Sequence, residues 1–128
     1  NPVRSSYSIT QEWDQIGWGT GEIHGGIDVA SIPVGSTPNI YAARSGTVTT
    51  VTFDVTGGNY VIVQHADGYW SYYGHFGSVS VAVGDSVTTD TVLGIMGQTG
   101  LATGVHLHFE VWKGAQWQRV NPRSVINF

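Results

Sequence analysis

Cysteine is absent from the sequence, which excludes disulfides, thiolate zinc sites and cysteine nucleophiles. Charge is scarce as well: 11% of the residues are charged and the formal net charge is −4, whereas about a quarter charged is usual. Without a basic patch, a role in binding nucleic acid has little support. Any bound metal must therefore use nitrogen and oxygen ligands, drawn from five His and nine acidic residues.

Long hydrophobic runs are also missing, and none could cross a bilayer as a helix, so we expect no membrane partner. The opening residues, Asn1-Pro2-Val3-Arg4, do not have the pattern of a signal peptide. A length of 128 residues is typical of one domain that buries its own core. We therefore expect residues 1–128 to form a single monomeric domain, one module of a longer protein that has a separate targeting domain.

Helical periodicity is almost absent, whereas 18 Gly and many Val, Thr and Tyr favour short strands joined by tight turns. Ala66-Asp67-Gly68 contains the Asp-Gly pair of a hairpin turn, and Gly57-Gly58-Asn59 tolerates positive φ. These signals predict an all-β antiparallel sheet domain, a sandwich or partly open barrel with a groove lined by loops. Residues 1–22 are predicted to be irregular. The predicted strands are Ile40–Arg44, Thr47–Asp54, Asn59–His65, Gly68–Gly74, Val79–Val83, Val92–Met96, Val105–Trp112 and Gln116–Val120.

The first candidate metal-binding segment is His24-Gly25-Gly26-Ile27-Asp28. Two Gly and a β-branched Ile disfavour a helix here. On a straight strand, the Cα atoms of His24 and Asp28 would be about 13 Å apart. Because zinc ligand atoms lie roughly 2 Å from the metal, the chain must bend between these residues if both are ligands, and Gly25-Gly26 is where a bend costs least.

Two further segments carry histidines. In His106-Leu107-His108 both imidazoles project from one face of a strand, so they can share a metal, or one can bind it while the other contacts its water. In Tyr73-Gly74-His75-Phe76, Tyr73 and His75 share a face if the strand is regular. A lone His, such as His65 beside the hairpin turn, is more often a surface or hydrogen-bonded core residue. The three segments together, however, indicate a metal site.

These three segments resemble those of the lysostaphin-like, LytM-type zinc endopeptidases. The pattern of that family is H-x-G-x-D, then Tyr-x-His, then a segment similar to Gly-Pro-His-Leu-His-Phe. The similarity runs from about His24 to Trp112 and includes Gly58–His65, Val83–Val87 and Leu93–Gly100. Gly74, Phe76 and Val105 stand where Ala, Leu and Pro are more usual, but every expected ligand is kept.

The resemblance implies a zinc metalloendopeptidase, a peptidoglycan hydrolase that cleaves peptide bonds of a cross-bridge or stem peptide with a zinc-activated water. It implies that His24, Asp28 and His108 are the zinc ligands and that His75 and His106 are the two catalytic histidines. Three protein ligands leave a fourth position open, which is the mark of a catalytic zinc site. Which histidine is the general base, and which bond is cleaved, stay open.

The resemblance also implies an extracellular or cell-wall location and a bacterial or phage source, as for an antibacterial endolysin or bacteriocin. Tyr73 is the best candidate for a substrate-binding residue, because it is expected near His75. Glu110 shares a strand face with His106 and His108 and could act as a base, but its distance along the strand favours a role in supporting a ligand. Glu22 is a weaker candidate for the base, also because of its reach. The other aromatic residues are expected in the core or on sheet faces: Trp13, Trp18, Trp70, Tyr72, Trp112 and Trp117.

Three alternatives compete with the peptidase. A catalytically inactive wall-binding or regulatory domain of the same fold would typically have lost ligands, and none is missing here. The stretch Val83–Gly97 has the hairpin rhythm of lipoyl and biotinyl domains, but these need a modified Lys at a hairpin tip, and Lys113 lies outside that stretch. A structural metal site in a lectin-like sandwich would be closed by a fourth protein ligand.

Overall fold

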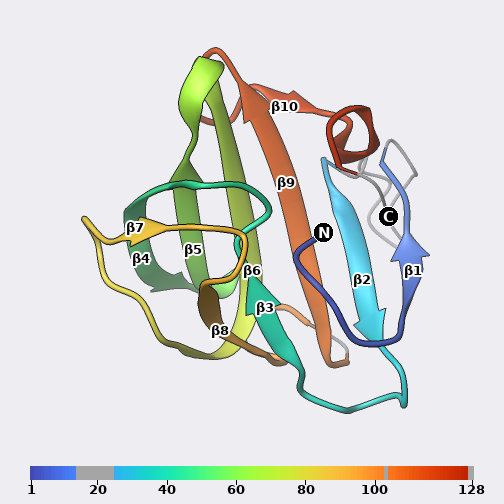
Figure 1. Ribbon diagram of the computed structural model, residues 1–128. Coiled ribbons are helices and arrows are strands. Elements are labelled where there is room, and N and C mark those ends of the chain that lie inside the picture. Colours follow the sequence, from blue (N-terminus) through green and yellow to red (C-terminus); the bar gives the residue numbers. More distant parts are fainter. Residues whose placement is uncertain (14–24, 103, 127–128) are drawn as a thin grey trace.

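The computed structural model describes residues 1–13, 25–102 and 104–126, and in this part of the chain ten strands form one antiparallel sheet (Figure 1). The main path runs β1-β2-β9-β6-β5-β4-β7, while β10 pairs with β9 and the short β3 pairs with β8, which itself pairs with β6. The strands are β1 Tyr7–Gln11, β2 Ile27–Ser31, β3 Asn39–Tyr41, β4 Gly46–Asp54, β5 Gly58–Gln64, β6 Tyr69–Val79, β7 Ser86–Val87, β8 Val92–Met96, β9 His106–Lys113 and β10 Arg119–Val120. Two short 3₁₀ turns, η1 Ala66–Gly68 and η2 Pro122–Ser124, complete the described elements.

The predicted all-β antiparallel class is confirmed, and the sheet is not closed into a barrel. In Figure 1, β3, β7 and β8 cross in front of the long central strands. The main hydrophobic core joins these short strands to one face of the long ones. Its buried members include Ile40, Val87, Leu93 and Met96 from the short strands, and Val29, Val61, Val63, Tyr73, Leu107, Phe109 and Val111 from the long strands.

Strand β9 shows how the sequence separates the two faces of the sheet. Leu107, Phe109 and Val111 are buried in the main core. Because successive side chains on a strand point to opposite faces, the intervening His108 and Glu110 point to the other face. The main core therefore holds one side of β9, and the polar site occupies the other.

The predicted strand positions are largely confirmed. The expected segment Val92–Met96 coincides with β8, and the expected strands at 47–54, 59–65 and 105–112 differ from β4, β5 and β9 by at most one residue at each end. The expectation of a separate strand at Val79–Val83 is wrong, because β6 continues to Val79 and the chain then turns. The irregular segment expected at 1–22 contains β1, which the polar-rich sequence did not reveal.

At two places in the described chain the backbone requires glycine or a residue that tolerates positive φ. Asp67 and Gly68 both have positive φ, 63° and 74°, and connect β5 to β6 as a tight hairpin. Gly26 precedes β2 where the chain passes close to β9, since a Cβ there would overlap the carbonyl oxygen of Phe109. Glycine is thus required at Gly26 for β2 to approach the strand that carries the histidines.

Among the residues that the structure describes, no helix is long and apolar enough to cross a membrane.

Candidate metal and catalytic site

Asp28 and His108 come together because β2 pairs with β9. The antiparallel register places Asp28 directly opposite His108, so the two side chains project from the same face of the sheet. Oδ1 of Asp28 lies 2.8 Å from Nδ1 of His108. Two predicted ligands that are 80 residues apart in the sequence therefore present an oxygen and a nitrogen to the same point.

The second nitrogen of His108 is held by Glu110. Oε2 of Glu110 lies 2.8 Å from Nε2 of His108, and Oε1 accepts hydrogen bonds from Trp112 Nε1 at 2.8 Å and from Arg119 Nε at 2.7 Å. Only 5% of Glu110 is exposed. Three donors converge on one buried carboxylate, so this carboxylate sets the orientation of the His108 ring.

Charge in this cluster determines the protonation of its members. Burial opposes a charge on His108, but the hydrogen bonds to Asp28 and Glu110 outweigh it and raise the pKa of His108 to about 9. Burial also opposes a charge on Glu110, yet the hydrogen bond from His108 and the nearby charges hold the pKa of Glu110 below its usual value. The Asp28–His108–Glu110 row is thus an alternation of negative, positive and negative groups when no metal is bound.

His106 lies two residues before His108 on the same strand. Its Nε2 atom is 3.8 Å from Oδ2 of Asp28, and its Nδ1 donates a hydrogen bond to the carbonyl oxygen of Gly104 at 3.0 Å. Because a carbonyl can only accept, Nδ1 carries the proton and Nε2 is the nitrogen directed at the site.

His75 reaches the same site through an irregularity in β6. Asn59 of β5 pairs with Phe76, and Val61 pairs with Tyr73, so β6 has one residue more than β5 between these pairs. This is the pattern of a β-bulge, and His75 within it has a positive φ of 67°. The bulge brings the His75 ring centroid to 4.6 Å from that of His106 and 6.2 Å from that of His108.

Two loops hold the bulged His75 in place. Its backbone N–H donates to the carbonyl oxygen of Gly57 at 2.7 Å, and its Nδ1 donates to the carbonyl oxygen of Thr99 at 2.7 Å. The Thr99 hydroxyl in turn donates to the carbonyl oxygen of Phe76 at 2.7 Å. Burial lowers the pKa of His75 to about 4 despite the bond to Thr99. The ring is therefore neutral at pH 7, with Nε2 as its acceptor nitrogen.

The structure corrects the prediction for Tyr73. Tyr73 is 0% exposed and packs in the main core, 5.3 Å from the Phe109 ring. Its hydroxyl accepts a hydrogen bond from the backbone N–H of Ala43 at 2.9 Å and lies 2.7 Å from the hydroxyl of Ser71. A regular strand would put Tyr73 and His75 on one face, but the bulge shifts His75 to the opposite face. The expectation that Tyr73 binds substrate is wrong for this reason.

Tyr72 occupies the place that was expected for Tyr73. It pairs with Glu110 across β6 and β9, and its ring centroid is 6.0 Å from that of His108 in an edge-on arrangement. The sequence contains Tyr72 and Tyr73 side by side, and no local pattern tells which of them faces the site. Only the position of the bulge does so.

The donor set suits zinc as far as it is described. A carboxylate oxygen and an imidazole nitrogen, held by Asp28 and His108, are atoms that zinc accepts. His24, the third predicted ligand, lies outside the described residues. Within the described part of the chain, no group of three or more His or acidic residues is arranged to hold a metal.

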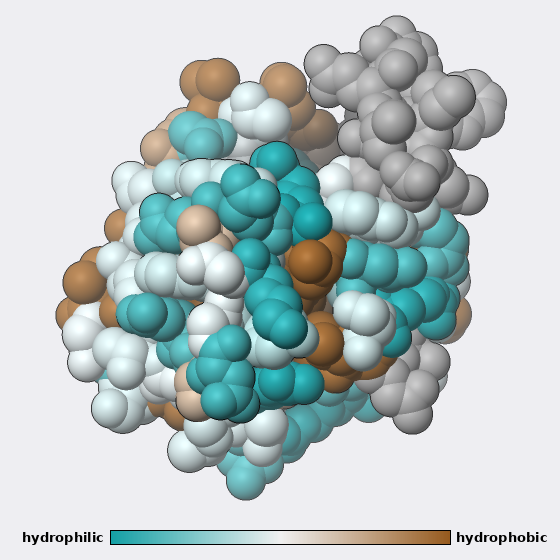
Figure 2. All heavy atoms as spheres, turned by 90° about the horizontal axis from the view of Figure 1, so that it is seen from above, coloured by the Kyte–Doolittle hydropathy of each residue, from teal (hydrophilic) through white to brown (hydrophobic). Residues whose placement is uncertain are grey.

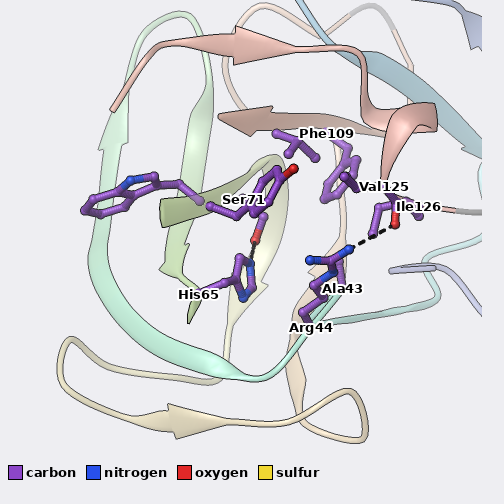
Figure 3. A pocket seen from close by; sticks show the side chains of 10 residues that line it. Ala43, Arg44, His65, Ser71, Phe109, Val125 and Ile126 are labelled. Atoms are coloured by element: carbon purple, nitrogen blue, oxygen red, sulfur yellow. Dashed lines mark hydrogen bonds between the residues drawn. The ribbon is translucent and has the colours of Figure 1, made fainter. Parts of the chain in front are cut away.

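A separate small hollow of about 10 Å³ lies on the core face of the sheet (Figure 3). It is lined by Ser71, Phe109 and Val111, which alternate with the residues of the metal site along β6 and β9. His65 borders it, with Nδ1 donating to the carbonyl oxygen of Ser45 at 2.9 Å and Nε2 2.7 Å from the Ser71 hydroxyl. His65 is thus a hydrogen-bonded, buried residue, and the hollow lies on the opposite face of the sheet from His108 and Glu110.

The surface seen from above is mostly hydrophilic or neutral in character (Figure 2). A short band of hydrophobic atoms lies between hydrophilic residues in this view.

The described site thus presents His75, His106 and His108 beside Asp28 on one polar face of an all-β sheet. The sequence pattern of Peptidase family M23 matches residues 22–122, and the chain belongs to this family. It is 38% identical over 88 residues to the peptidoglycan DD-endopeptidase ShyA of Vibrio cholerae, a match covering 69% of this chain and 20% of ShyA. It is 40% identical over 106 residues to the DD-carboxypeptidase/endopeptidase Mpg of Neisseria meningitidis, covering 83% of this chain and 23% of Mpg.

Solved structures agree with this assignment. The catalytic domain of the prophage-encoded M23 protein EnpA from Enterococcus faecalis superposes with a TM-score of 0.82 at 32% identity, covering 95% of this chain and 93% of that one. The catalytic domain of lysostaphin from Staphylococcus simulans gives a TM-score of 0.82 at 26% identity, covering 92% and 90%. The resemblance to lysostaphin-like peptidases is thereby confirmed.

The complex of SpoIIIAH and SpoIIQ also contains a similar chain, with a TM-score of 0.86 at 28% identity and coverage of 98% of both chains. The chain spans only 20% to 26% of the length of the curated relatives ShyA, Mpg and a metalloprotease of Buchnera aphidicola. A peptidase of family M23 is the class that the fold and the comparisons establish.

Proposed function

We propose that this domain is a zinc-dependent endopeptidase that hydrolyses peptide bonds in the cross-bridges or stem peptides of bacterial peptidoglycan. The observation that carries the proposal is the pairing of Asp28 with His108 beside the two neighbouring rings of His75 and His106. The relatives named as peptidoglycan DD-endopeptidases support the substrate class.

The residues divide into two groups. Asp28 and His108, with His24, would hold the zinc, which when bound supplies a Lewis acid that acidifies water and polarises a carbonyl. His75 and His106 each donate from Nδ1 to a backbone carbonyl, so each directs Nε2 toward the site. One of these Nε2 atoms accepts a proton from the attacking water, and an imidazole that has gained a proton can deliver it to the leaving amine.

A catalytically inactive binding domain of the same fold is the second candidate, because a chain of similar structure occurs in the complex of SpoIIIAH and SpoIIQ. Against it stands the presence of all five residues of the predicted site in this sequence. Binding of the wall without cleavage is the behaviour that would distinguish this candidate from an enzyme.

The wider setting is part of the proposal. The short span relative to its curated relatives supports a module that works together with other domains. Cleavage of peptidoglycan requires access to the wall, so we place the domain outside the cytoplasm, at the cell wall, as part of an antibacterial wall hydrolase from a bacterium or a phage.

Purified walls of several peptidoglycan types provide the test. The domain is loaded with zinc, incubated with each wall, and the released fragments are identified by mass spectrometry. New amino termini that vanish in a His106→Ala variant with undiminished zinc content support the enzyme. Release of no fragment from any wall by the zinc-loaded domain would contradict it.

A further inference from the structure

Arg119 on β10 is directly linked to the polar site. The register of β10 and β9 places Arg119 opposite Trp112, which shares a strand face with Glu110 two residues earlier. Nε of Arg119 donates to Oε1 of Glu110 at 2.7 Å, and Oε2 of Glu110 lies 2.8 Å from Nε2 of His108. A single carboxylate therefore separates the guanidinium from the His108 ring.

Two further contacts hold the Arg119 side chain in place. Gly25 packs directly against its aliphatic part, since a Cβ at Gly25 would lie 2.5 Å from Cδ of Arg119. The guanidinium lies over the Trp117 ring, 5.3 Å from its centroid, and that centroid is 4.4 Å from the centroid of Trp112. Gly25 directly follows His24 in the sequence. Arg119 thus packs against the segment that is expected to supply the third ligand.

The contact with Glu110 uses only part of the hydrogen-bonding capacity of Arg119. A guanidinium has five N–H groups, and the bond to Glu110 occupies the one at Nε. The terminal nitrogens form no hydrogen bond with any residue that the structure describes, and 40% of the side chain is exposed. Two free terminal nitrogens form a fork that matches the oxygens of a second carboxylate. Arg119 is thus both held in place and able to bind an anion.

The charge of the domain as a whole does not favour anionic ligands. The formal net charge is −4, which disfavours the approach of an anionic peptide. Other arginines have their own carboxylates: Arg4 pairs with Asp90, and Arg123 contacts both oxygens of Glu12. Selection of an anionic peptide at the candidate site would therefore depend on Arg119.

The separation between Arg119 and the predicted ligands determines where a recognised carboxylate must lie in a substrate. Two hydrogen bonds, one carboxylate and one imidazole ring separate Nε of Arg119 from Nδ1 of His108, which faces Asp28, so the path is at most roughly 10 Å long. An extended peptide covers that distance in about three residues. A peptide whose reacting bond lies beside Asp28 and His108 therefore reaches Arg119 with a group no more than about three residues away.

We propose that Arg119 is a substrate-binding residue that recognises a free carboxylate within about three residues of the scissile bond, so that the domain prefers anionic peptides over uncharged ones. This inference rests on the proposed endopeptidase function and adds the charge of the substrate to it. The carboxylate belongs either to the C-terminus of a peptide or to an acidic side chain, and the fork fits both. At a partly exposed position, such a charge-assisted pair corresponds to about a tenfold preference at low salt.

The first experiment uses peptides built around the bond that wall digestion identifies. One series ends one, two, three or six residues after that bond, and each member is made as the free acid and as the carboxamide. A second series ends in a carboxamide throughout and carries Glu or Gln at the same positions, which separates a side-chain carboxylate from a C-terminal one. The zinc-loaded wild type is compared with Arg119→Gln and Arg119→Lys, and zinc content and thermal unfolding are recorded for each protein.

Arg4→Gln is the matched control. Arg4 also pairs with a carboxylate, that of Asp90 at 2.9 Å, and also lies over an aromatic ring, 3.9 Å from the centroid of Tyr41. These partners belong to β3 and to the turn between β7 and β8, on the core side of the long strands. Its replacement should therefore leave the preference for anionic peptides unchanged.

The wild type should cleave the acid about tenfold better than the amide, as judged by kcat/KM, when the carboxylate lies within three residues of the bond. This ratio should approach one at six residues and decrease as salt is added. Arg119→Gln should bring it close to one by raising KM for the acid, and Arg119→Lys should give an intermediate ratio, because an ammonium keeps the charge without the fork. A purely structural role through Glu110 would lower zinc content and cleavage of both peptides alike and leave their ratio intact.

The second experiment does not depend on cleavage. Acetyl-Ala-Ala is titrated into the zinc-loaded domain as the free acid and as the carboxamide, while NMR follows the backbone amides and the Arg119 side-chain N–H groups. The wild type should bind the acid about tenfold more tightly than the amide and shift the Arg119 resonances. Arg119→Gln should bring the two affinities together, whereas Arg4→Gln should not.

An acid-to-amide ratio that Arg119→Gln leaves unchanged, or a wild type without preference for the acid, would overturn the role of Arg119 while leaving the peptidase intact. Failure of the wild type to cleave any wall would instead remove the proposed function. In that case the titration still decides: tighter binding of the acid that depends on Arg119 supports carboxylate recognition, and equal binding of acid and amide overturns it.

Discussion

Glu110 and His108 are joined by a 2.8 Å contact between Oε2 and Nε2, while the other oxygen of Glu110 accepts from Trp112 and Arg119. Glu110 thus fixes the orientation of the His108 ring through Nε2, and this orientation directs the other nitrogen, Nδ1, toward Asp28. Residues in this relation to a metal-binding histidine typically change metal affinity about 10- to 100-fold when they are replaced.

Replacing Glu110 should therefore weaken zinc binding. Glu110→Ala removes the acceptor for all three donors, and we expect zinc affinity to fall about 10- to 100-fold. Competition with a chromophoric chelator measures this. The matched control is Glu12→Ala, which breaks an exposed ion pair with Arg123 and should leave zinc affinity unchanged. Equal zinc affinity of Glu110→Ala and wild type would contradict the positioning role.

Removing a predicted ligand should abolish metal and activity together. His108→Ala loses the nitrogen that faces Asp28, and His24→Ala loses the third predicted ligand, so neither variant should retain zinc after dialysis. Metal analysis of the dialysed proteins and cleavage of purified walls are the two measurements. Full zinc content in His108→Ala would show that the ligand set is assigned incorrectly.

His75→Ala should separate chemistry from metal binding. His75 is not a predicted zinc ligand: its Nδ1 donates to the Thr99 carbonyl and its ring lies beside that of His106, so its loss should leave zinc in place. Wall hydrolysis should fall by about 10²- to 10⁴-fold, the usual contribution of a general acid or base. Loss of zinc in this variant would reverse the roles assigned to the histidines.

Tyr73→Phe tests the corrected position of Tyr73. The change leaves the backbone N–H of Ala43 without its acceptor inside the core, so the free energy of unfolding should drop by about 1–3 kcal/mol. Chemical denaturation measures it. Because the hydroxyl points into the core, away from His75, His106 and His108, the kcat/KM of the folded variant should stay near that of wild type. A large fall in kcat/KM at unchanged stability would restore the substrate-binding interpretation.

His65 should make the domain sensitive to acid. Burial lowers the pKa of His65 below its unfolded value of about 6.5, although the hydrogen bond to Ser45 opposes this. Above pH 6.5 His65 is neutral in both states and its contribution is constant. As the pH falls below 6.5, the unfolded state takes up the proton first, so the free energy of unfolding decreases until the folded pKa is passed.

His65→Gln should reduce this dependence. Measured by denaturant titration at pH 7.5 and pH 5.5, the loss of stability on acidification should be smaller in the variant than in wild type. The comparison of the two pH dependences removes the contribution of the carboxylates, which both proteins share. An equal loss in both would show that His65 does not carry the effect.

The fold class and part of the arrangement of the candidate site were predictable from short-range sequence features. Glycine-separated β-branched runs predicted the antiparallel strands, and H-x-H on a strand predicted that His106 and His108 would share a face, as in β9. The structure also brings Asp28 and His75 to these histidines. Strand β1 was not predicted, because its alternation is weak and its stability comes from pairing with β2.

The roles of Tyr72, Tyr73 and Glu110 were not readable from the sequence. An extra residue in β6 places Tyr73 in the core and leaves Tyr72 beside His108, and only pairing with β5 reveals that bulge. Glu110 was recognised as a neighbour of the histidines, but its three donors come from β9 and from Arg119 on β10.

The amino-acid sequence by itself determined which atoms were available: nitrogen and oxygen ligands without thiolate, on strands whose alternation is a local property of the backbone. The tertiary structure decided which of these atoms meet. Register depends on pairing between residues as distant as Asp28 and His108, and a single inserted residue exchanges the two faces of a strand.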